Sequence, residues 1–377
     1  MAPIRGPSNR PLHFVASILL GLVAAGCDGG VTGPSGQPQD QLLVLVHQPG
    51  QMPPYLRVSD IYRINADGTG AVNLTSSPAV YGGLDLSPDG STIAFTSNPG
   101  SGGRHVWLMS TDGTGRRRIT TDGFGSNRTP RWSADGTRIA YTHSAPGGPA
   151  TVFVVPAGGG TTIDVSSEAI AADAPCSDDQ KRLQLIGWTA DDRVLFSNYI
   201  CGVGHRHYIV NGDGSNPSAW DLDPFTSYWS PDGSSIALTS NGAVPRLMIM
   251  AADGSNLREL TDHPGDLRLP SRTTITQYRT DYDPWSPGGS ELVFEERSDG
   301  LPTFVLNAIG VNGSGLRPLT DLVGEFNGWS PDGDRIAFSS MVSGTWNVYV
   351  VNADGTGLIN ITESAGEATN AIWLPHE

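Results

Sequence analysis

The stretch Trp329-Ser330-Pro331-Asp332-Gly333, followed directly by Asp334-Arg335-Ile336-Ala337-Phe338, decides how this chain folds. The same pattern occurs five more times, once in a degraded form. Successive Ser or Thr residues of the pattern are 46, 56, 41, 56 and 44 residues apart. Repetition at this period indicates an array of one small structural unit. In the five earlier copies this Ser or Thr is Ser87, Ser133, Thr189, Ser230 and Ser286.

Each repeat contains two tight turns between short strands. Pro-Asp-Gly is a turn signal because proline presets φ, aspartate bonds the nearby backbone and glycine accepts a positive φ. Asp354-Gly355-Thr356-Gly357 is an example of the second turn, which lies between runs rich in Ile, Val and Tyr. Each repeat therefore predicts four antiparallel strands, here called A to D, with A ending at the Trp-Ser. Four strands in about 40–45 residues are typical of a β-propeller blade.

The two ends of the chain complement each other. Residues 42–46, 61–64 and 72–75 supply strands B, C and D with no A strand before them, whereas Ile372-Trp373-Leu374-Pro375 is an A strand with nothing after it. Pairing the C-terminal strand with the N-terminal blade would complete the ring and remove its open edges. We therefore predict an all-β fold, a seven-bladed β-propeller over residues 41–377.

The combined motif is similar to the WD40-like repeat of the TolB-type β-propeller family. The resemblance includes the Trp-Ser-Pro-Asp-Gly-x-x-Ile-Ala-Phe pattern, the Asn-Ala-Asp-Gly-Thr-Gly turn at 352–357 and the Leu-Thr or Ile-Thr that ends each repeat. It implies a propeller but not a function, since propellers host unrelated activities. TolB itself has six blades and an additional N-terminal α/β domain, for which this chain has no room.

The composition excludes some classes of partner. Gly 48 and Pro 28 in 377 residues suit a chain that turns every few residues, and the formal net charge is -15. An acidic balance argues against the basic surface that nucleic-acid binding requires. We therefore expect no nucleic-acid partner.

The N-terminal sequence predicts that the protein is exported from the cytoplasm. Residues 1–26 combine a basic start, an apolar run over 12–25 and small residues directly before Cys27, which resembles a bacterial lipobox. Cys27 would then be lipidated, and residues 27–40, rich in Gly, Pro and Ser, would form a flexible tether. The alternative is an ordinary secretory peptide with a chance cysteine. A lipid-anchored protein of the bacterial cell envelope follows, on the periplasmic side or the cell surface, with the leaflet left open.

Export also makes the other two cysteines informative. Cys176 lies in the D–A connection before the strand that ends at Trp188, and Cys201 lies in the B–C connection of the same blade. In a meander of four strands these connections share a face, so we predict a Cys176–Cys201 disulfide. Two free thiols are the alternative.

The two faces of the ring are expected to differ. A–B and C–D connections are nearly all tight turns, whereas B–C and D–A connections, such as 166–182 and 262–282, are long and irregular. Binding residues concentrate in variable loops on a rigid scaffold. We predict a binding surface where the D–A connections enter the innermost strands at the channel mouth, although an ordinary wet channel would carry similar residues. The candidate residues are Tyr81, Arg128, Tyr228, Arg279, Asp281, Asp283, Glu325 and Asn327.

Signals for catalysis and metal binding are weak. His47, His143 and Glu296 end B strands of three different blades and are too far apart to share a metal ion. The chain has no G-x-S-x-G, H-E-x-x-H or P-loop motif. Asp281 and Asp283 point to one side of an extended segment, which alone is a weak acid–base signal. We predict no catalytic residue, metal or cofactor, and we expect the repeated tryptophans to pack between blades.

The favoured function is a non-enzymatic, monomeric envelope lipoprotein that binds an envelope protein or peptide through the loop-rich face. Only the lipid anchor would contact the membrane. A carbohydrate-active enzyme or glycan-binding propeller using the same channel mouth is the alternative, and a purely structural envelope protein is a third interpretation. Participation of Tol-system components would follow only by analogy with the family.

Overall fold

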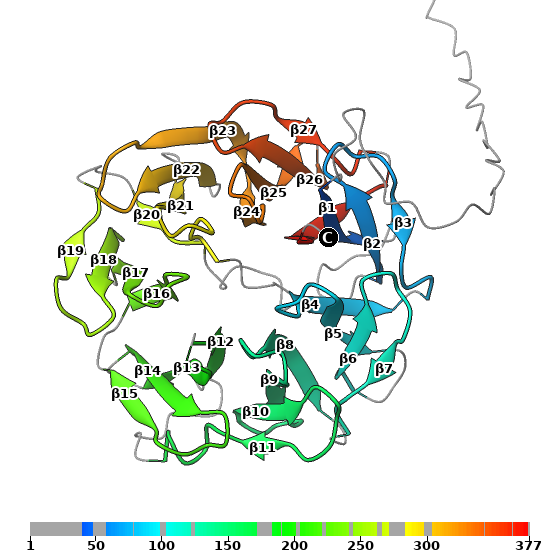
Figure 1. The fold of residues 1–377 in the computed structure, drawn as a ribbon, viewed down its shortest axis with the longest axis vertical. Coiled ribbons are helices and arrows are strands. Elements are labelled where there is room, and N and C mark those ends of the chain that lie inside the picture. The colour runs from blue at the N-terminus through cyan, green and yellow to red at the C-terminus, as the bar shows by residue number, and fades with distance from the viewer. Residues whose placement is uncertain are drawn as a thin grey trace, which may run out of the picture. The chain divides into compact units, whose positions relative to one another are not determined.

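Residues 39–377 form a ring of seven four-stranded sheets (Figure 1). The described residues contain no helix that could span a membrane. Each sheet is an antiparallel meander, and strand A lies innermost, as β4, β8, β12, β16 and β24 do in Figure 1. The computed structural model describes residues 40–47, 58–77, 79–98, 103–121, 125–171, 183–189, 191–200, 204–220, 224–240, 244–261, 266–270, 283–297, 304–342, 344–363 and 365–375.

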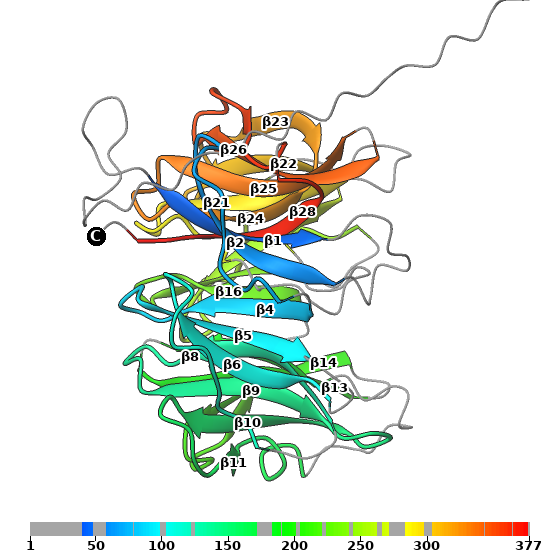
Figure 2. The same ribbon diagram turned by 90° about the vertical axis from the view of Figure 1, so that its right-hand side faces the viewer.

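We number the blades from the N-terminus, and Figure 2 shows β4, β5 and β6 of blade 2 side by side. Blade 1 contains β28 (Ala368–Trp373), β1 (Gln41–His47), β2 (Ser59–Asn65) and β3 (Val72–Asn73). Blade 2 contains β4 (Val80–Leu86), β5 (Thr92–Asn98), β6 (His105–Ser110) and β7 (Arg117–Arg118). Blade 3 contains β8 (Ser126–Trp132), β9 (Arg138–Ser144), β10 (Ala150–Pro156) and β11 (Ile163–Asp164). Blade 4 contains β12 (Gln184–Trp188), β13 (Arg193–Ile200), β14 (Gly204–Asn211) and β15 (Ser218–Trp220).

The remaining three blades follow in chain order. Blade 5 contains β16 (Pro224–Trp229), β17 (Ser235–Ser240), β18 (Leu247–Ala251) and β19 (Arg258–Glu259). Blade 6 contains β20 (Leu267–Arg268), β21 (Glu291–Arg297), β22 (Phe304–Gly310) and β23 (Arg317–Val323). Blade 7 contains β24 (Glu325–Trp329), β25 (Arg335–Val342), β26 (Thr345–Asn352) and β27 (Ile359–Asn360).

The ring closes through its own two ends, as the sequence predicts. Strand β28 pairs with β1 in antiparallel register, with Leu42 opposite Trp373 and Val46 opposite Ala368. The Leu374 amide also donates to the carbonyl oxygen of Gln41 at 2.8 Å. The last strand of the chain is therefore the innermost strand of the first blade, and this pairing leaves no open edge at the seam.

Blade 6 differs from the sequence prediction, which placed one uninterrupted A strand before Trp285 and one loop over 262–282. Strand β20 already pairs with the end of β21, with Leu267 opposite Glu296. Trp285 then pairs with Leu292 farther along the same strand. The A strand of this blade is therefore made of two pieces, and residues 269–284 are inserted between them.

The threonine that ends most repeats replaces a backbone bond. Strand D is only two residues long in most blades, so the adjacent C strand would lose hydrogen bonds beyond it. Thr120 Oγ1 accepts from the Val106 amide at 3.1 Å, and Thr362 Oγ1 accepts from the Val348 amide at 2.9 Å. A side-chain oxygen thus satisfies a buried backbone donor, which would otherwise be costly.

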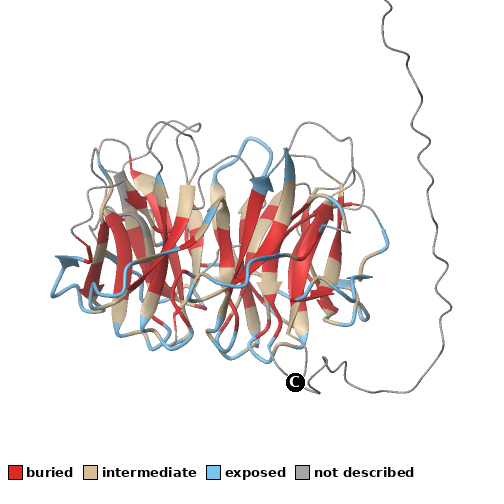
Figure 3. Ribbon diagram, turned by 90° about the horizontal axis from the view of Figure 1, so that it is seen from above, coloured by how far each residue is buried: buried red, intermediate tan, exposed pale blue. Residues whose placement is uncertain are grey.

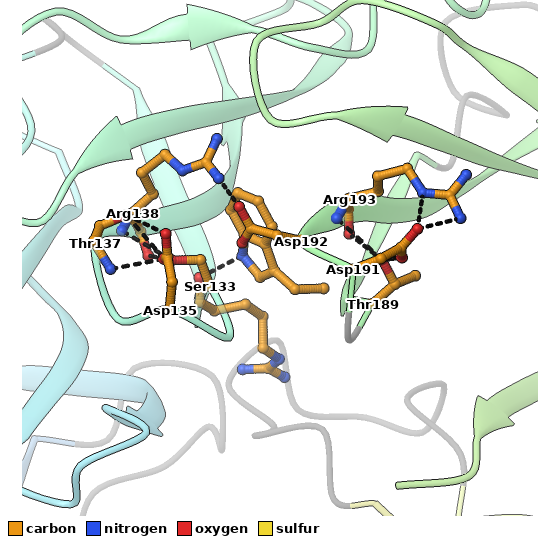
Figure 4. Close-up of polar contacts among 10 residues, drawn as sticks. Ser133, Asp135, Thr137, Arg138, Thr189, Asp191, Asp192 and Arg193 are labelled. Carbon is orange, nitrogen blue, oxygen red and sulfur yellow. Dashed lines mark hydrogen bonds and ion pairs between the residues drawn. The ribbon is translucent and has the colours of Figure 1, made fainter. Parts of the chain in front are cut away.

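The Ser-x-Asp-Gly turns share a hydrogen-bond pattern, which Figure 4 shows in blade 3 beside the variant turn Thr189-Ala190-Asp191-Asp192 of blade 4. Ser133 Oγ donates to Asp135 Oδ1 at 2.6 Å, and the Thr137 amide donates to the same oxygen at 2.9 Å. The Arg138 amide closes the turn on Ser133 Oγ at 2.9 Å. Because these bonds favour the charged form, with that from Ser133 the largest cause, the pKa of Asp135 falls to about 2. The repeated Ser and Asp are therefore structural.

The repeated tryptophans join consecutive blades, as predicted. Trp329 Nε1 donates to the Pro284 carbonyl at 3.0 Å, and Trp373 Nε1 donates to the Gly328 carbonyl at 3.1 Å. Each indole thus reaches the residue next to the tryptophan of the preceding blade. Arg138 adds a second link, since it forms an ion pair with Asp192 and lies over the Trp188 ring (Figure 4).

The hydrophobic core lies between blades rather than at one centre. One buried cluster joins Val293 and Leu306 of blade 6 to Phe338 and Val351 of blade 7. Each sheet thus buries one face against the blade before it and the other against the blade after it. This packing explains why the B strands are apolar at consecutive positions instead of alternating.

Candidate functional site: the loop-rich face and the ring centre

The tight turns are uniform and lie along one edge of the ring (Figure 3). Every C–D connection leaves six residues between its strands, from 66–71 in blade 1 to 353–358 in blade 7. We call this edge the tight-turn face. Its side chains are used within the turns and between neighbouring blades, so its regularity follows from the demands of chain reversal.

The opposite face, here called the loop-rich face, carries connections of very different length. The sheet order places all B–C and D–A connections there. D–A connections range from the single residue Gly324 to the nineteen residues 165–183, and B–C connections from 343–344 to 48–58. The face is therefore more uneven than predicted, because blade 7 has a very short B–C connection and enters its A strand almost directly.

A bulge occurs in the innermost strand of most blades. The pairing register shifts between Arg128 and Arg131 in β8 and between Phe326 and Gly328 in β24. At these register shifts the backbone adopts positive φ angles, which are +46° at Thr129 and +149° at Gly328. A bulge bends its strand and re-aims the side chains beside it. Arg128 and Asn327 both lie at such positions.

Tyr81 is one of three predicted site residues that the structure places in the protein interior. Its side chain is 2% exposed and packs in the core between blades 1 and 2. The hydroxyl donates to the Ser77 carbonyl at 2.7 Å and accepts from Arg116 Nη1 at 2.9 Å. The Tyr81 side chain therefore supports the blade junction and is not presented to a ligand.

Tyr228 and Asn327 are also buried. The Tyr228 hydroxyl donates to the Pro270 carbonyl at 2.6 Å, while its own carbonyl accepts from Trp285 Nε1 at 3.1 Å. Asn327 Oδ1 accepts from Ser339 Oγ at 2.6 Å. Both residues connect inner strands to their neighbours. Through its hydrogen bond to the Pro270 carbonyl, Tyr228 also fixes the start of the segment that is inserted after β20.

Asp283 is the most unusual carboxylate among the described candidates. It lies where the inserted segment of blade 6 returns to the ring, and its Oδ1 accepts from the Trp285 amide at 3.0 Å. The residue is exposed, yet protein surrounds it densely, and this desolvation raises its pKa to about 7. Because the carboxylate is exposed, solvent screens part of this desolvation effect but does not change its direction.

Arg128 and Glu325 are partly exposed at the starts of their inner strands. Arg128 Nε donates to Ser126 Oγ at 3.1 Å, and Glu325 lies opposite Ser339. Together with Asp283 they are the predicted candidates that remain accessible. Two further candidates, Arg279 and Asp281, lie outside the described residues, as do Cys27, Cys176 and Cys201, so the lipidation and the disulfide remain predictions.

The histidines and the glutamate at the ends of B strands have separate partners. His47 Nε2 lies 2.8 Å from Thr369 Oγ1, and His143 Nδ1 lies 2.6 Å from Asn127 Oδ1. Glu296 Oε2 accepts from Asn307 Nδ2 at 3.2 Å. Within the described ranges, no group of three or more His, Cys, Asp or Glu residues is placed to hold a metal ion.

Known proteins share this architecture. TolB from Acinetobacter baumannii superposes with a TM-score of 0.52 and 15% identity over 89% of this chain and 67% of that one. Oligogalacturonate lyase from Vibrio parahaemolyticus superposes with a TM-score of 0.57 and 15% identity over 82% of this chain and 91% of that one. At these identities the likeness shows the fold alone, which is a β-propeller.

Sequence comparison adds one partial match. Tricorn protease homolog 1 of Streptomyces coelicolor is 35% identical over 108 residues, which are 29% of this chain and 8% of that protein. The chain thus matches a small part of this relative's length. No family model matches the chain.

Proposed function

We propose that the chain is a lipid-anchored protein of the bacterial cell envelope that binds a protein or peptide through its loop-rich face without catalysing a reaction. The observation that carries this proposal is the contrast between C–D connections of constant length and D–A connections of one to nineteen residues on the same scaffold. Chain reversal does not require such variation, and rigid scaffolds commonly present binding residues on loops of this kind.

The strand directions support a consistent orientation. Strand β1 begins at Gln41 and β28 ends at Trp373, and both points lie on the tight-turn face. A tether that runs from Cys27 to residue 40 would therefore join the propeller at that face. The attachment point of the tether would then lie on a different face from the proposed binding surface. The fold shared with TolB is compatible with an envelope location.

The accessible side chains of the site combine both signs of charge. Arg128 offers a cation, while Glu325 and Asp283 offer carboxylates on other blades. Such an arrangement suits a polar peptide segment that spans several blades, because charge pairs across an interface mainly set specificity and association rate.

Charge reversal tests the proposal. Arg128→Glu, alone and combined with Arg279→Glu, should remove a partner that the wild-type protein captures from envelope extracts after cross-linking. Arg118→Glu is the matched control, since Arg118 is exposed on the outermost strand β7. Capture that survives the reversal at Arg128 and Arg279, or that is lost equally with Arg118→Glu, would contradict binding through the loop-rich face.

A second candidate function follows from the likeness to the lyase. Oligogalacturonate lyase structures, one of them in complex with manganese, superpose with TM-scores of 0.56 and 0.57. The alternative is a glycan-binding or glycan-cleaving propeller that uses the same channel mouth, with Asp283 as its acid–base group. A glycan array followed by a turnover assay separates the two functions. Saturable glycan cleavage that Asp283→Asn abolishes would favour the second.

A further inference from the structure

The B–C hairpin of blade 7 carries exposed apolar side chains on the loop-rich face. Strands β25 and β26 stay paired to their ends, with Met341 opposite Trp346 and Val342 opposite Thr345. Met341 is 51% exposed and Val342 is 37% exposed, while Trp346 is partly exposed. Only residues 343–344 separate the two strands, so these side chains stand on paired strands. We call Met341, Val342 and Trp346 the hairpin patch.

Met341 and Trp346 lie on the side of blade 7 that faces blade 1. Side chains alternate between the two faces of a sheet along each strand, and directly paired residues point to the same face. Ala337 and Val348 belong to the buried cluster that joins blade 7 to Leu42 of blade 1. Met341 is four residues after Ala337 and Trp346 is two residues before Val348, so both share that face. The pair therefore continues the core of this junction to a level that solvent reaches.

Blade 7 is acidic at this end. Residues 318–377 contain a single Lys or Arg, which is Arg335. Arg335 begins β25 on the tight-turn side and forms an ion pair with Asp40 there. Glu325 stands opposite Ser339, which is two residues before Met341, so Glu325 lies on the same face of the sheet as Met341.

The connection from β27 to β28 brings two more carboxylates beside the hairpin. Thr362 Oγ1 accepts from the Val348 amide at 2.9 Å, which fixes the start of this connection against β26. Ala365 packs against the same buried cluster as Val348. Glu363 and Glu367 adjoin these two contacts in the sequence, and Glu363 is exposed while Glu367 is partly exposed. Glutamates of β24 and of this connection therefore border the hairpin patch.

This combination selects a partner by its chemistry. Trp and Met are enriched at protein interfaces, and a guanidinium is attracted to the face of an indole ring. Carboxylates around an apolar patch attract arginine and repel acidic segments, which mainly sets specificity and association rate. A second copy of this chain would bring the same carboxylates against each other, and the formal net charge of -15 adds to that repulsion. The surface therefore suits a basic partner rather than a copy of itself.

We propose that the hairpin patch docks a peptide segment in which arginines flank one or two apolar side chains. The apolar side chains would cover Met341 and Trp346. The arginines would pair with Glu325, Glu363 or Glu367. This inference rests on the proposed function, because it specifies the chemistry of the partner that the loop-rich face binds.

Titration of the full chain with fluorescein-labelled Gly-Arg-Arg-Leu-Leu-Arg-Arg-Gly, followed by fluorescence anisotropy, tests this surface. The wild-type protein should bind the peptide saturably, and more weakly as salt is added. Two counterpart peptides control for the acidic charge of the whole protein. Replacement of both Leu by Ser should weaken binding at least about fivefold, and replacement of every Arg by Glu should abolish it. Equal binding of the Ser counterpart would overturn the proposal, since net charge alone would then explain the attraction.

Two pairs of variants locate the contact. Met341→Ser should weaken binding about threefold to tenfold without lowering the unfolding temperature. Its control is Leu358→Ser, at a 44% exposed position on the tight-turn side of the same blade, which should leave binding unchanged. Glu363→Gln should weaken binding about two- to fivefold, as expected for an exposed ion pair. Asp334→Asn, in the exposed A–B turn of blade 7, should not weaken it.

Absence of saturable binding by the wild type would overturn the proposal, as would unchanged binding by Met341→Ser and Glu363→Gln. Equal losses in Leu358→Ser and Asp334→Asn would overturn it too, because the contact would then not lie at the hairpin patch. The probe is a defined peptide, so these outcomes do not depend on capture of an envelope partner through Arg128. Failure of this inference and failure of the proposed function are therefore recognised separately.

Discussion

The two faces of this propeller are built from the same strands but under different constraints. On the tight-turn face, six residues separate every C and D strand, and the Ser and Asp side chains are used in the turns. On the loop-rich face, the D–A connections vary from one to nineteen residues. Stabilising contacts are therefore concentrated at the turns and blade junctions, and the loop-rich face tolerates changes in loop length.

The strongest test of this contrast is removal of a junction tryptophan. Trp329→Ala should lower the free energy of unfolding by about 3–5 kcal/mol, because Trp329 is 8% exposed in a core shared by blades 6 and 7. Urea unfolding measures the change. The matched control on the loop-rich face is Met341→Ala, which should cost less than about 0.5 kcal/mol since Met341 is 51% exposed. Equal losses would show that the faces do not differ.

A turn serine should have a smaller effect. Ser330→Ala removes an oxygen that accepts from the Arg335 amide at 2.9 Å and a hydroxyl that donates to Asp332. We expect a loss of about 1–3 kcal/mol, because a buried backbone donor loses its partner. Thr345→Ala, at an exposed position on the loop-rich face, serves as the comparison in the same unfolding experiment and should be close to neutral. A neutral Ser330→Ala would contradict the structural role of the turn.

Acid should weaken the turns first. The folded-state pKa of Asp135 is about 2, below its usual value of 3.8, so its contribution to stability is complete above pH 4 and is lost as pH falls toward 2. Asp135→Asn should therefore flatten the decline of unfolding free energy over this window. Unfolding curves at pH 4.5, 3 and 2 measure it. If Asp135→Asn left the pH dependence of the unfolding free energy unchanged, protonation of Asp135 would not be coupled to folding.

Asp283, which accepts from the Trp285 amide, should show a pH dependence of the opposite sign. Its pKa is raised to about 7, so the folded protein holds this proton more tightly than the unfolded chain does. The associated stability is greatest below pH 3.8 and is lost as pH rises through 7. Asp283→Asn should remove this loss, and water around the exposed carboxylate makes the effect the smallest of the set. Chemical-shift titration of the carboxyl group checks the direction, and a midpoint below 4 would contradict it.

The repeat made most of the fold predictable. Each Ser-x-Asp-Gly turn and each terminal Thr acts through bonds to residues a few positions away or in the adjacent strand, as with Thr362 and Val348. Such contacts leave a local signature in the sequence. The closure of β28 on β1 was predictable for a related reason, since a missing A strand at one end matched a surplus strand at the other.

The candidate site was less predictable. The sequence placed Tyr81, Tyr228 and Asn327 just before the inner strands, as a binding residue would be, but they lie within β4, β16 and β24 and are buried by contacts with neighbouring strands and blades. The interruption of the A strand in blade 6 was missed because β20 contributes only Leu267 and Arg268, too short a segment to show periodicity.

The amino-acid sequence by itself determined the blade, the number of blades and the way the ring closes, because these depend on turns and strand patterns that repeat within about 40–45 residues. Only the tertiary structure decided which candidate side chains remain exposed and where the innermost strand of blade 6 is interrupted. The physical reason is that each blade buries both of its faces against neighbours that lie far away in the sequence. Exposure and packing at any one position therefore depend on two other blades.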